Sequence, residues 1–248
     1  MRNFKMVLAY DGTNYSGWQI QKGALTIEEV LEKAIHAITR EKVRVMGSGR
    51  TDAGVHALGQ VAHFRSKTQL SPSQLKRAVN SKLPSDIRIL KLEEVPLNFH
   101  AQYWVKTKIY RYQIWNGEEL PVFERDFLLY HPEKLDVMSM KRASRLLLGR
   151  HDFSSFGVNR HLKGGRKENS VRMMKKAIVK KKGFYVTIEL EADGFLYKMV
   201  RSIVGTLLAV GEGKLTPDDF KKILSEKNRS SAGQTAPPQG LFLVKVKY

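Results

Sequence analysis

The sequence contains no cysteine, and this absence excludes several kinds of chemistry at once. Disulfide bonds, thiolate nucleophiles, zinc ribbons and iron–sulfur ligation all depend on cysteine. With 248 residues, of which 42% are hydrophobic, the chain is nonetheless long and apolar enough to bury a core without cross-links, and it could form two ordinary domains. This composition suits a reducing compartment, and we expect a cytoplasmic protein.

Long hydrophobic runs are also absent. The longest apolar stretch, residues 199–211, contains Arg201 and is shorter than the roughly 18 residues that a membrane-spanning helix needs. The opening segment MRNFKMVLAYDG reaches an aspartate too early for a secretory signal, and its apolar residues alternate as they do in a strand. We therefore expect neither a signal peptide nor a membrane partner.

Acidic residues are scarce relative to basic ones. The 24 Asp and Glu residues stand against 43 Lys and Arg, which gives a formal charge of +19 and a pI near 10.0. Such an excess destabilises a compact fold by self-repulsion, so a polyanion such as nucleic acid is the simplest partner to infer. Residues 160–182 hold ten of these basic residues and a single acid, Glu168. A charge run of this kind is usually a solvated loop and strand edge, but in a chain this basic it favours a nucleic-acid surface.

The first half of the chain is predicted to run strand, helix, strand, strand, helix, strand. Apolar residues at helical spacing follow Thr26, which we expect to be an N-cap with Glu29 completing a capping box. A second helix is expected after Ser71, with Pro72 in its first position. The predicted strands of this half are residues 4–11, 42–47, 60–66 and 86–95.

A similar order of elements begins again near residue 106. The predicted elements are strand 108–115, helix 136–149, strands 171–181 and 183–192, helix 196–211 and strand 241–248, with longer loops at 116–134 and 152–169. Repetition of this order suggests an α+β protein made of two tandem ferredoxin-like domains with antiparallel sheets, the arrangement also found in RNA-recognition (RRM-like) modules. We place an N-terminal domain at residues 1–103 and a C-terminal domain at residues 104–248.

One stretch, GSGRTDAGVHALGQVAHF at residues 47–64, fits none of the common ligand motifs. Its glycines are wrongly spaced for a dinucleotide fingerprint, and no Lys-Ser or Lys-Thr follows as in a phosphate-binding loop. His56 and His63 lie seven residues apart, the other histidines are scattered, and we expect no metal site. Arg50 and Asp52 stand among very small residues, which is consistent either with an ionised carboxylate in a narrow pocket or with an ion pair in a surface turn.

This stretch resembles the active-site signature of the TruA family of tRNA pseudouridine synthases, in which the aspartate of the R-T-D-A-G-V-H-A core is the catalytic residue. The match is ungapped, and it covers residues 47–64. Further segments similar to the family occur in order along essentially the whole chain: YDGTNYSGWQIQ, FHAQYWVKTKIYRYQI, GRHDFSSF, FLYKMVRSIVGTLLAVG and APPQGLFLVKVKY.

The resemblance assigns a role to each of five residues. Asp52 is the implied catalytic carboxylate, acting as a nucleophile at the base or assisting cleavage of the glycosidic bond. Arg50 would help to extrude the target nucleotide and occupy its place in the stack. Tyr110 would stack on the flipped base, and Leu241 would line the apolar side of the pocket. Arg201 would pair with Asp52 in a catalytic cleft between the two domains.

The residues themselves support part of this scheme. An enzyme cannot exchange the bond between uracil and ribose while the base is stacked in a helix, so the base must flip out. Arg201 lies in a helix with a strong apolar stripe, where an unpaired guanidinium is costly. Tyr110, by contrast, shares a strand face with Tyr112, so without the resemblance an ordinary cross-strand aromatic pair is the favoured interpretation of that residue.

The resemblance implies a tRNA pseudouridine synthase that acts without a cofactor in the anticodon stem-loop, at tRNA positions 38, 39 and 40, as a homodimer bound to tRNA. The sequence departs from the family pattern in three places. Ser48 stands where Ala is more usual, which is a mild change. Gln102 stands where Arg is more usual, and residues 160–182 match poorly beyond Ser170 and Arg172, and these two departures concern contact with tRNA. Two alternatives therefore stay open: a non-catalytic RNA-binding protein on the same scaffold, and a paralogue that acts on other uridines.

Overall fold

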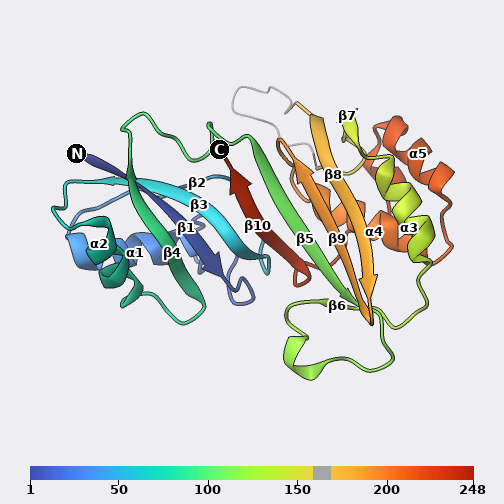
Figure 1. Ribbon diagram of the computed structural model, residues 1–248, viewed down its shortest axis with the longest axis horizontal. Helices are drawn as coiled ribbons and strands as arrows, with labels where there is room; N and C mark the ends of the chain where they lie inside the picture. The colour runs from blue at the N-terminus through green and yellow to red at the C-terminus, as the bar shows by residue number, and fades with distance from the viewer. Residues whose placement is uncertain (159–168) are drawn as a thin grey trace. The chain divides into compact units, whose positions relative to one another are not determined.

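The computed structural model describes residues 1–158 and 169–248, in which five α-helices are combined with mostly antiparallel sheet (Figure 1). By their internal contacts the residues form two compact units, Met1–Lys106 with Phe242–Tyr248, and Thr107–Leu241. This grouping differs from the predicted boundary in the placement of the last strand, and the division into domains at residue 103 stays a prediction. No helix in the described ranges is long and apolar enough to cross a membrane.

In the first unit β1 is the central strand of an antiparallel arrangement. It pairs with β3 on one side and with β4 on the other, and β2 pairs with the far edge of β3. The C-terminal strand β10 runs parallel to β3 along the same far edge, through Phe242 and Leu243. The elements of this unit are β1 (Arg2–Tyr10), α1 (Ile27–Thr39), β2 (Met46–Gly47), β3 (His56–Ser66), α2 (Pro72–Asn80), β4 (Ile87–Val95) and β10 (Leu241–Lys247).

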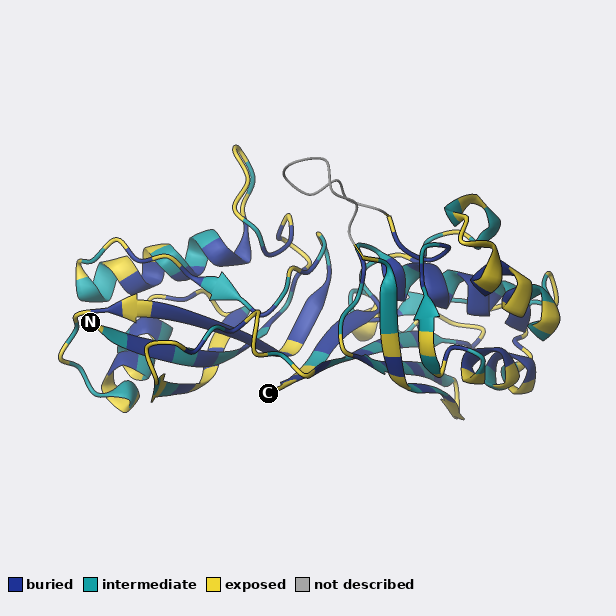
Figure 2. Cartoon of the chain, turned by 90° about the horizontal axis from the view of Figure 1, so that it is seen from above, coloured by how far each residue is buried: buried dark blue, intermediate teal, exposed yellow. Residues whose placement is uncertain are grey.

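The core of the first unit follows from the alternation of β1. Phe4, Met6, Leu8 and Tyr10 are buried, while the residues between them are half-exposed, as expected for a strand with one face on the core. Phe4 stacks on Phe64 of β3 at 5.5 Å between ring centroids. Figure 2 colours each residue by burial, so this alternation can be followed along the strands.

The start of α1 differs from the prediction. Thr26 takes the N-cap position, but its side chain makes no capping bond, and its buried hydroxyl has no partner among the described residues. The first helical amides are satisfied instead by backbone, with Ile27 N donating to Gly17 O and Glu28 N to Trp18 O. The predicted capping box with Glu29 is therefore wrong, and the Glu29 carboxylate pairs instead with Lys33 one turn further along the helix.

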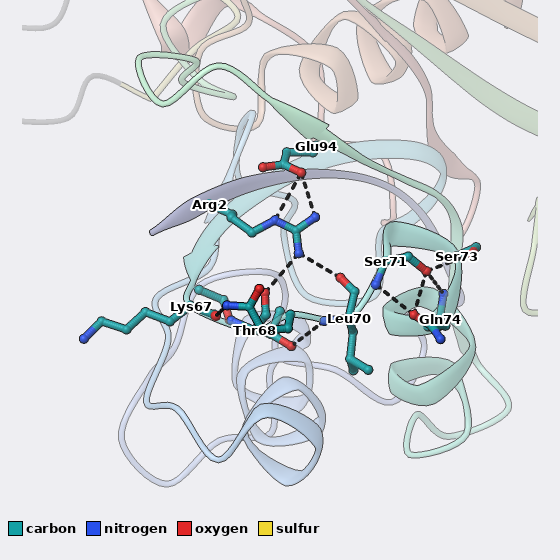
Figure 3. Close-up of polar contacts among 10 residues, drawn as sticks. Arg2, Lys67, Thr68, Leu70, Ser71, Ser73, Gln74 and Glu94 are labelled. Carbon is teal, nitrogen blue, oxygen red and sulfur yellow. Dashed lines mark hydrogen bonds and ion pairs between the residues drawn. The ribbon is translucent and has the colours of Figure 1, made fainter.

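The start of α2 confirms the prediction. Ser71 Oγ accepts from Gln74 N at 3.3 Å, and Gln74 Oε1 accepts from Ser71 N at 2.9 Å, which completes a capping box (Figure 3). Next to it, the Arg2 guanidinium bonds to Glu94 of β4 and to the Thr68 and Leu70 carbonyl oxygens. Arg2 therefore ties β1 to its neighbouring strand and to the loop that leads into α2.

In the second unit the strands pair antiparallel in the order β5-β9-β8-β7, and the short β6 lies parallel to β5. The order of its elements is β5 (Thr107–Trp115), a 3-10 turn at Val122–Glu124, β6 (Leu129–Tyr130), α3 (Val137–Arg145), β7 (Gly149–Asp152), β8 (Val171–Lys182), β9 (Tyr185–Ala192), α4 (Met199–Gly211), α5 (Pro217–Glu226) and a 3-10 turn at Arg229–Ser231. Residues 160–168 of the predicted basic surface lie outside the described residues.

Three elements of the second unit depart from expectation. The helix expected to run to residue 149 ends at Arg145, because residues 149–152 form β7 and pair with β8. α4 begins at Met199 rather than at residue 196, since Lys198 before it has a left-handed φ of 60°. α5 is absent from the prediction, although Thr216 and Asp219 form a complete capping box at its start.

Candidate active site

The loop that carries Arg50 and Asp52 connects β2 to β3 in the first unit, and an earlier segment of the chain holds it in place. Trp18 N donates to Thr51 O at 3.1 Å, and Gly54 N donates to Tyr15 O at 3.3 Å. Within the loop, Val55 N donates to Asp52 O at 3.2 Å. The backbone on both sides of Asp52 is therefore hydrogen-bonded to residues 15–18.

Glycines in that earlier segment allow the close approach. Gly17 has a φ of +90°, and a Cβ placed on it would lie 2.6 Å from Thr51 O. A Cβ on Gly12 would lie 2.1 Å from Val55 O. The small residues of the signature were expected to admit another molecule; at Gly12 and Gly17 the close approach to this loop is made by the chain itself.

Buried polar side chains also form hydrogen bonds to this loop. Tyr10 Oη and Thr51 Oγ1 are 2.8 Å apart, and burial raises the pKa of Tyr10 to about 12, so this phenol stays neutral at physiological pH. Gln60 accepts from Ser48 Oγ at 2.7 Å and donates to Gly49 O at 3.0 Å. Because these groups are buried and satisfied, they fix the loop in one conformation.

Arg50 is exposed, and its position is set by a glutamine outside the signature. Its Nε donates to Gln19 Oε1 at 2.9 Å, and Gln19 Nε2 in turn donates to the Glu28 carboxylate. Glu28 also accepts from Ile20 N at 3.0 Å, and burial raises the pKa of its carboxyl.

In the second unit, Arg201 and Leu241 are linked by the segment between residues 236 and 241. Arg201 lies in the first turn of α4, where its Nε donates to Ala236 O at 2.7 Å and its own carbonyl accepts from Ala236 N at 3.0 Å. Leu241 is buried, and its N donates to Pro238 O at 2.9 Å. The Arg201 side chain therefore braces the segment that leads to Leu241.

Tyr110 is buried on β5 and lies edge-on to Phe195 at 5.0 Å between ring centroids. Two residues further along the same face, Tyr112 Oη donates to Pro237 O at 2.8 Å, which holds the 236–241 segment from the strand side. The structure thus groups Arg50 with Asp52 in the first unit, and Tyr110, Arg201 and Leu241 in the second.

Several supporting residues were missed from sequence, namely Gln19, Glu28, Tyr10 and Gln60. Tyr10 and Gln19 fall within YDGTNYSGWQIQ and Gln60 within the signature at residues 47–64, but no pattern gave any of them a role, and Glu28 lies outside the segments that resemble the family. Among residues 1–158 and 169–248, no group of three or more His, Asp or Glu side chains is arranged to hold a metal ion.

Comparison with known proteins shows which family the chain belongs to. Residues 6–104 and 143–248 match the family model described as tRNA pseudouridine synthase, and the chain belongs to that family. It is 45% identical over 249 residues to the tRNA pseudouridine synthase A of Thermoanaerobacter sp. strain X514, with all of both chains covered. It is 45% identical over 248 residues to the tRNA pseudouridine synthase A 2 of Clostridium perfringens strain 13, again with all of both chains covered.

Two further comparisons are a third relative of similar identity and a solved structure of low similarity. The tRNA pseudouridine synthase A 1 of Protochlamydia amoebophila is 43% identical over 249 residues, which cover the whole chain and 97% of that protein. A chain in the solved structure titled "Crystal Structure of a Cbf5-Nop10-Gar1 Complex" is 13% identical, with a TM-score of 0.30 over 83% of this chain and 54% of that one. A TM-score this low supports no assignment of the fold.

Proposed function

We propose that this protein isomerises uridine to pseudouridine in tRNA, with Asp52 as the catalytic carboxylate. The observation that supports this most strongly is the Asp52 loop, in which an ungapped family signature coincides with a backbone held by Tyr10, Thr51 and Gln60. A carboxylate that must meet a flipped base needs such a fixed position, because a displacement of about 1 Å can cost a hundredfold in rate.

The reaction breaks the bond from ribose C1′ to uracil N1 and forms a bond from C1′ to C5 of the same base. The C5 hydrogen is then lost as a proton and N1 gains one, so substrate and product are isomers and no group donor or redox partner is required. Asp52 either attacks the base or assists cleavage of the glycosidic bond. In both schemes its carboxylate must be ionised at the start.

The other site residues take roles around this step. Arg201 is proposed to pair with Asp52 and orient it, and its fixed contact with Ala236 supports a positioning role. Tyr110 is proposed to stack on the flipped base, an interaction typically worth about 1–3 kcal/mol. Arg50, exposed and bonded through its Nε to Gln19, is proposed to fill the gap that the uridine leaves. Leu241 is proposed to line the apolar side of the pocket.

We further propose that each unit has ferredoxin-like topology and that the protein is a cytoplasmic homodimer. In the first unit the antiparallel order β4-β1-β3-β2 supports the topology, because a β-α-β-β-α-β chain of the ferredoxin type arranges its four strands in this order. The target uridines are proposed to lie in the anticodon stem-loop. This substrate position rests on the family resemblance.

The test is to map pseudouridine by carbodiimide modification and primer extension on unmodified total tRNA, after incubation with the protein or its Asp52→Asn variant. We expect Asp52-dependent stops on the 3′ side of the anticodon stem-loop. Stops at other uridines would contradict the substrate position while leaving the chemistry intact. Tight tRNA binding without any stops would instead support a non-catalytic RNA-binding protein.

A further inference from the structure

The sheet of the second unit has a face that the active-site residues do not use. Along β5, β9 and β8, which lie side by side in Figure 1, side chains alternate between the buried core and this second face. Tyr110 belongs to the core side. We call the other side the open face and define it by six side chains that line one hollow of about 280 Å³, Arg111, Lys176, Lys180, Lys182, Tyr185 and Glu189.

The strand register sets these residues in cross-strand rows. Tyr185 lies between Trp115 on β5 and Lys182 on β8. Lys180 pairs with Thr187 in the next row, and Glu189 pairs with Arg111 in the row after that. The basic residues of the open face are therefore presented by regular strands, whose spacing is fixed, rather than by a loop.

The charge on the open face is mostly positive and only partly balanced. Glu189 accepts from Lys176 at 2.5 Å and from Arg111 at 3.3 Å. Burial by itself would raise the pKa of Glu189, but these hydrogen bonds hold it below its ordinary value, so the carboxylate is ionised and neutralises one cation. Lys180 and Lys182 are exposed, and their ammonium groups make no hydrogen bond or ion pair with any described residue.

Aromatic rings lie at the Lys182 end of the open face. Trp115 is perpendicular to Tyr185 at 4.9 Å and tilted against Phe184 at 5.3 Å between ring centroids. Phe184, in the turn between β8 and β9, is 56% exposed. Exposed lysines beside an exposed ring are the combination with which proteins hold RNA, because lysines contact phosphates and rings stack on bases.

We propose that the open face is a second RNA-binding surface, on the opposite side of the sheet from Tyr110, that takes a phosphodiester segment through Lys180 and Lys182 and a base on Phe184. This inference rests on the proposed function, since it supposes an RNA substrate. A second copy of the chain is a poorer occupant of this face, because lysine is depleted at the cores of protein interfaces.

The first test removes the two unpaired charges together, in Lys180→Gln/Lys182→Gln. Its matched control is Lys221→Gln/Lys222→Gln, which removes the same charge from exposed positions on α5. Fluorescence anisotropy with unmodified tRNA should give a Kd about tenfold higher for the first variant at 0.1 M salt, and a log Kd against log salt slope shallower by roughly 0.7–0.9 per lysine. The control should stay within about twofold of the parent.

A second readout locates the contact without relying on turnover. Lysine acetylation followed by mass spectrometry should find Lys180 and Lys182 protected when tRNA is bound, while Lys221 and Lys222 react as they do in the free protein. In steady-state assays the Lys180→Gln/Lys182→Gln variant should raise KM while kcat stays near that of the parent, since the open face lies away from the reacting base.

Two outcomes would overturn the proposal. One is an unchanged Kd in the Lys180→Gln/Lys182→Gln variant together with no protection of either lysine by tRNA. The other is an unchanged Kd combined with a change of mass in sedimentation, which would make the open face an interface between copies. Failure of the proposed function is distinguishable, because a protein that protects Lys180 with tRNA but forms no pseudouridine contradicts only the catalytic assignment.

Discussion

At the residue scale, the loop that carries Asp52 is held in place by uncharged side chains from two neighbouring strands of the first unit. Tyr10 reaches Thr51 from β1, and Gln60 reaches Gly49 from β3. The Tyr10→Phe variant removes only the hydroxyl of the first of these contacts. We expect it to lower the free energy of unfolding by about 1 kcal/mol, the usual value of one buried hydrogen bond, and to lower kcat more than tRNA affinity.

Urea unfolding and single-turnover rates would check this expectation. A Tyr10→Phe protein with the parent's stability and rate would mean that the Thr51 contact does not position the loop. The signature itself could be found from sequence, since it is contiguous. The contact from Tyr10 could not, because this residue is brought to the loop only by the pairing of β1 with β3.

His63 makes the stability of the protein sensitive to acid. Its Nδ1 accepts from Ala101 N at 3.2 Å, and burial, together with His100 and Arg65 nearby, lowers its pKa from 6.5 to about 4. Between those two values the unfolded chain binds more protons than the folded one, so stability present above pH 6.5 is lost as the pH falls toward 4. We expect the titration of His63 to lower the free energy of unfolding by about 2 kcal/mol between pH 7.5 and pH 5.

The check is urea unfolding of the parent and of His63→Gln at both pH values. The glutamine variant should be less stable at pH 7.5 but should lose less stability on acidification. Equal losses in the two proteins would show that other groups, not His63, carry the acid sensitivity.

At the element scale, a local signal predicted the start of α2, whereas the start of α1 depends on contacts from elsewhere in the chain. α2 has its capping box in consecutive residues and begins where expected. At α1 the first helical amides donate to the carbonyl groups of Gly17 and Trp18 instead of to a side-chain cap. No pattern in the residues around the helix start predicts this contact. α5 was missed even though the sequence from Thr216 to Asp219 carries the signal of a capping box. That failure was one of interpretation, since the local information was present.

The segment of residues 12–18 is expected to control the active-site loop, and Gly17→Ala tests this. A methyl group at Gly17 would meet Thr51 O at 2.6 Å, whereas one at Gly23, which also has a positive φ, would meet nothing within 4 Å. Gly23→Ala therefore measures only the cost of placing alanine at a positive φ, about 1 kcal/mol, without a steric clash. We expect Gly17→Ala to be less stable than Gly23→Ala and to reduce kcat more than about tenfold, because the loop with Asp52 must shift.

Thermal unfolding and single-turnover rates of the two variants give the comparison. If Gly17→Ala matched Gly23→Ala in both stability and rate, the close approach of residue 17 to Thr51 would have no bearing on the site.

At the scale of the whole molecule, the charge of +19 is expected to dominate binding. Affinity for tRNA should come mainly from phosphate contacts, each of which releases counterions, so log Kd should rise steeply and linearly with log salt. A protein with about six such contacts would lose roughly a thousandfold in affinity between 50 mM and 200 mM salt. Titrations of tRNA into the Asp52→Asn variant would measure this without turnover, and a response close to flat would contradict the interpretation of the charge.

The central claim, that Asp52 drives isomerisation of uridine in tRNA, is tested most directly by the release of tritium. Formation of the new bond at C5 expels the hydrogen carried there, so tRNA transcribed with [5-³H]uridine should release tritium to water when the protein is added. We predict stoichiometric release with the parent protein and none above background with Asp52→Asn, although that variant should bind tRNA with an affinity close to the parent's. Tritium release by Asp52→Asn at a sizeable fraction of the parent rate would contradict the account.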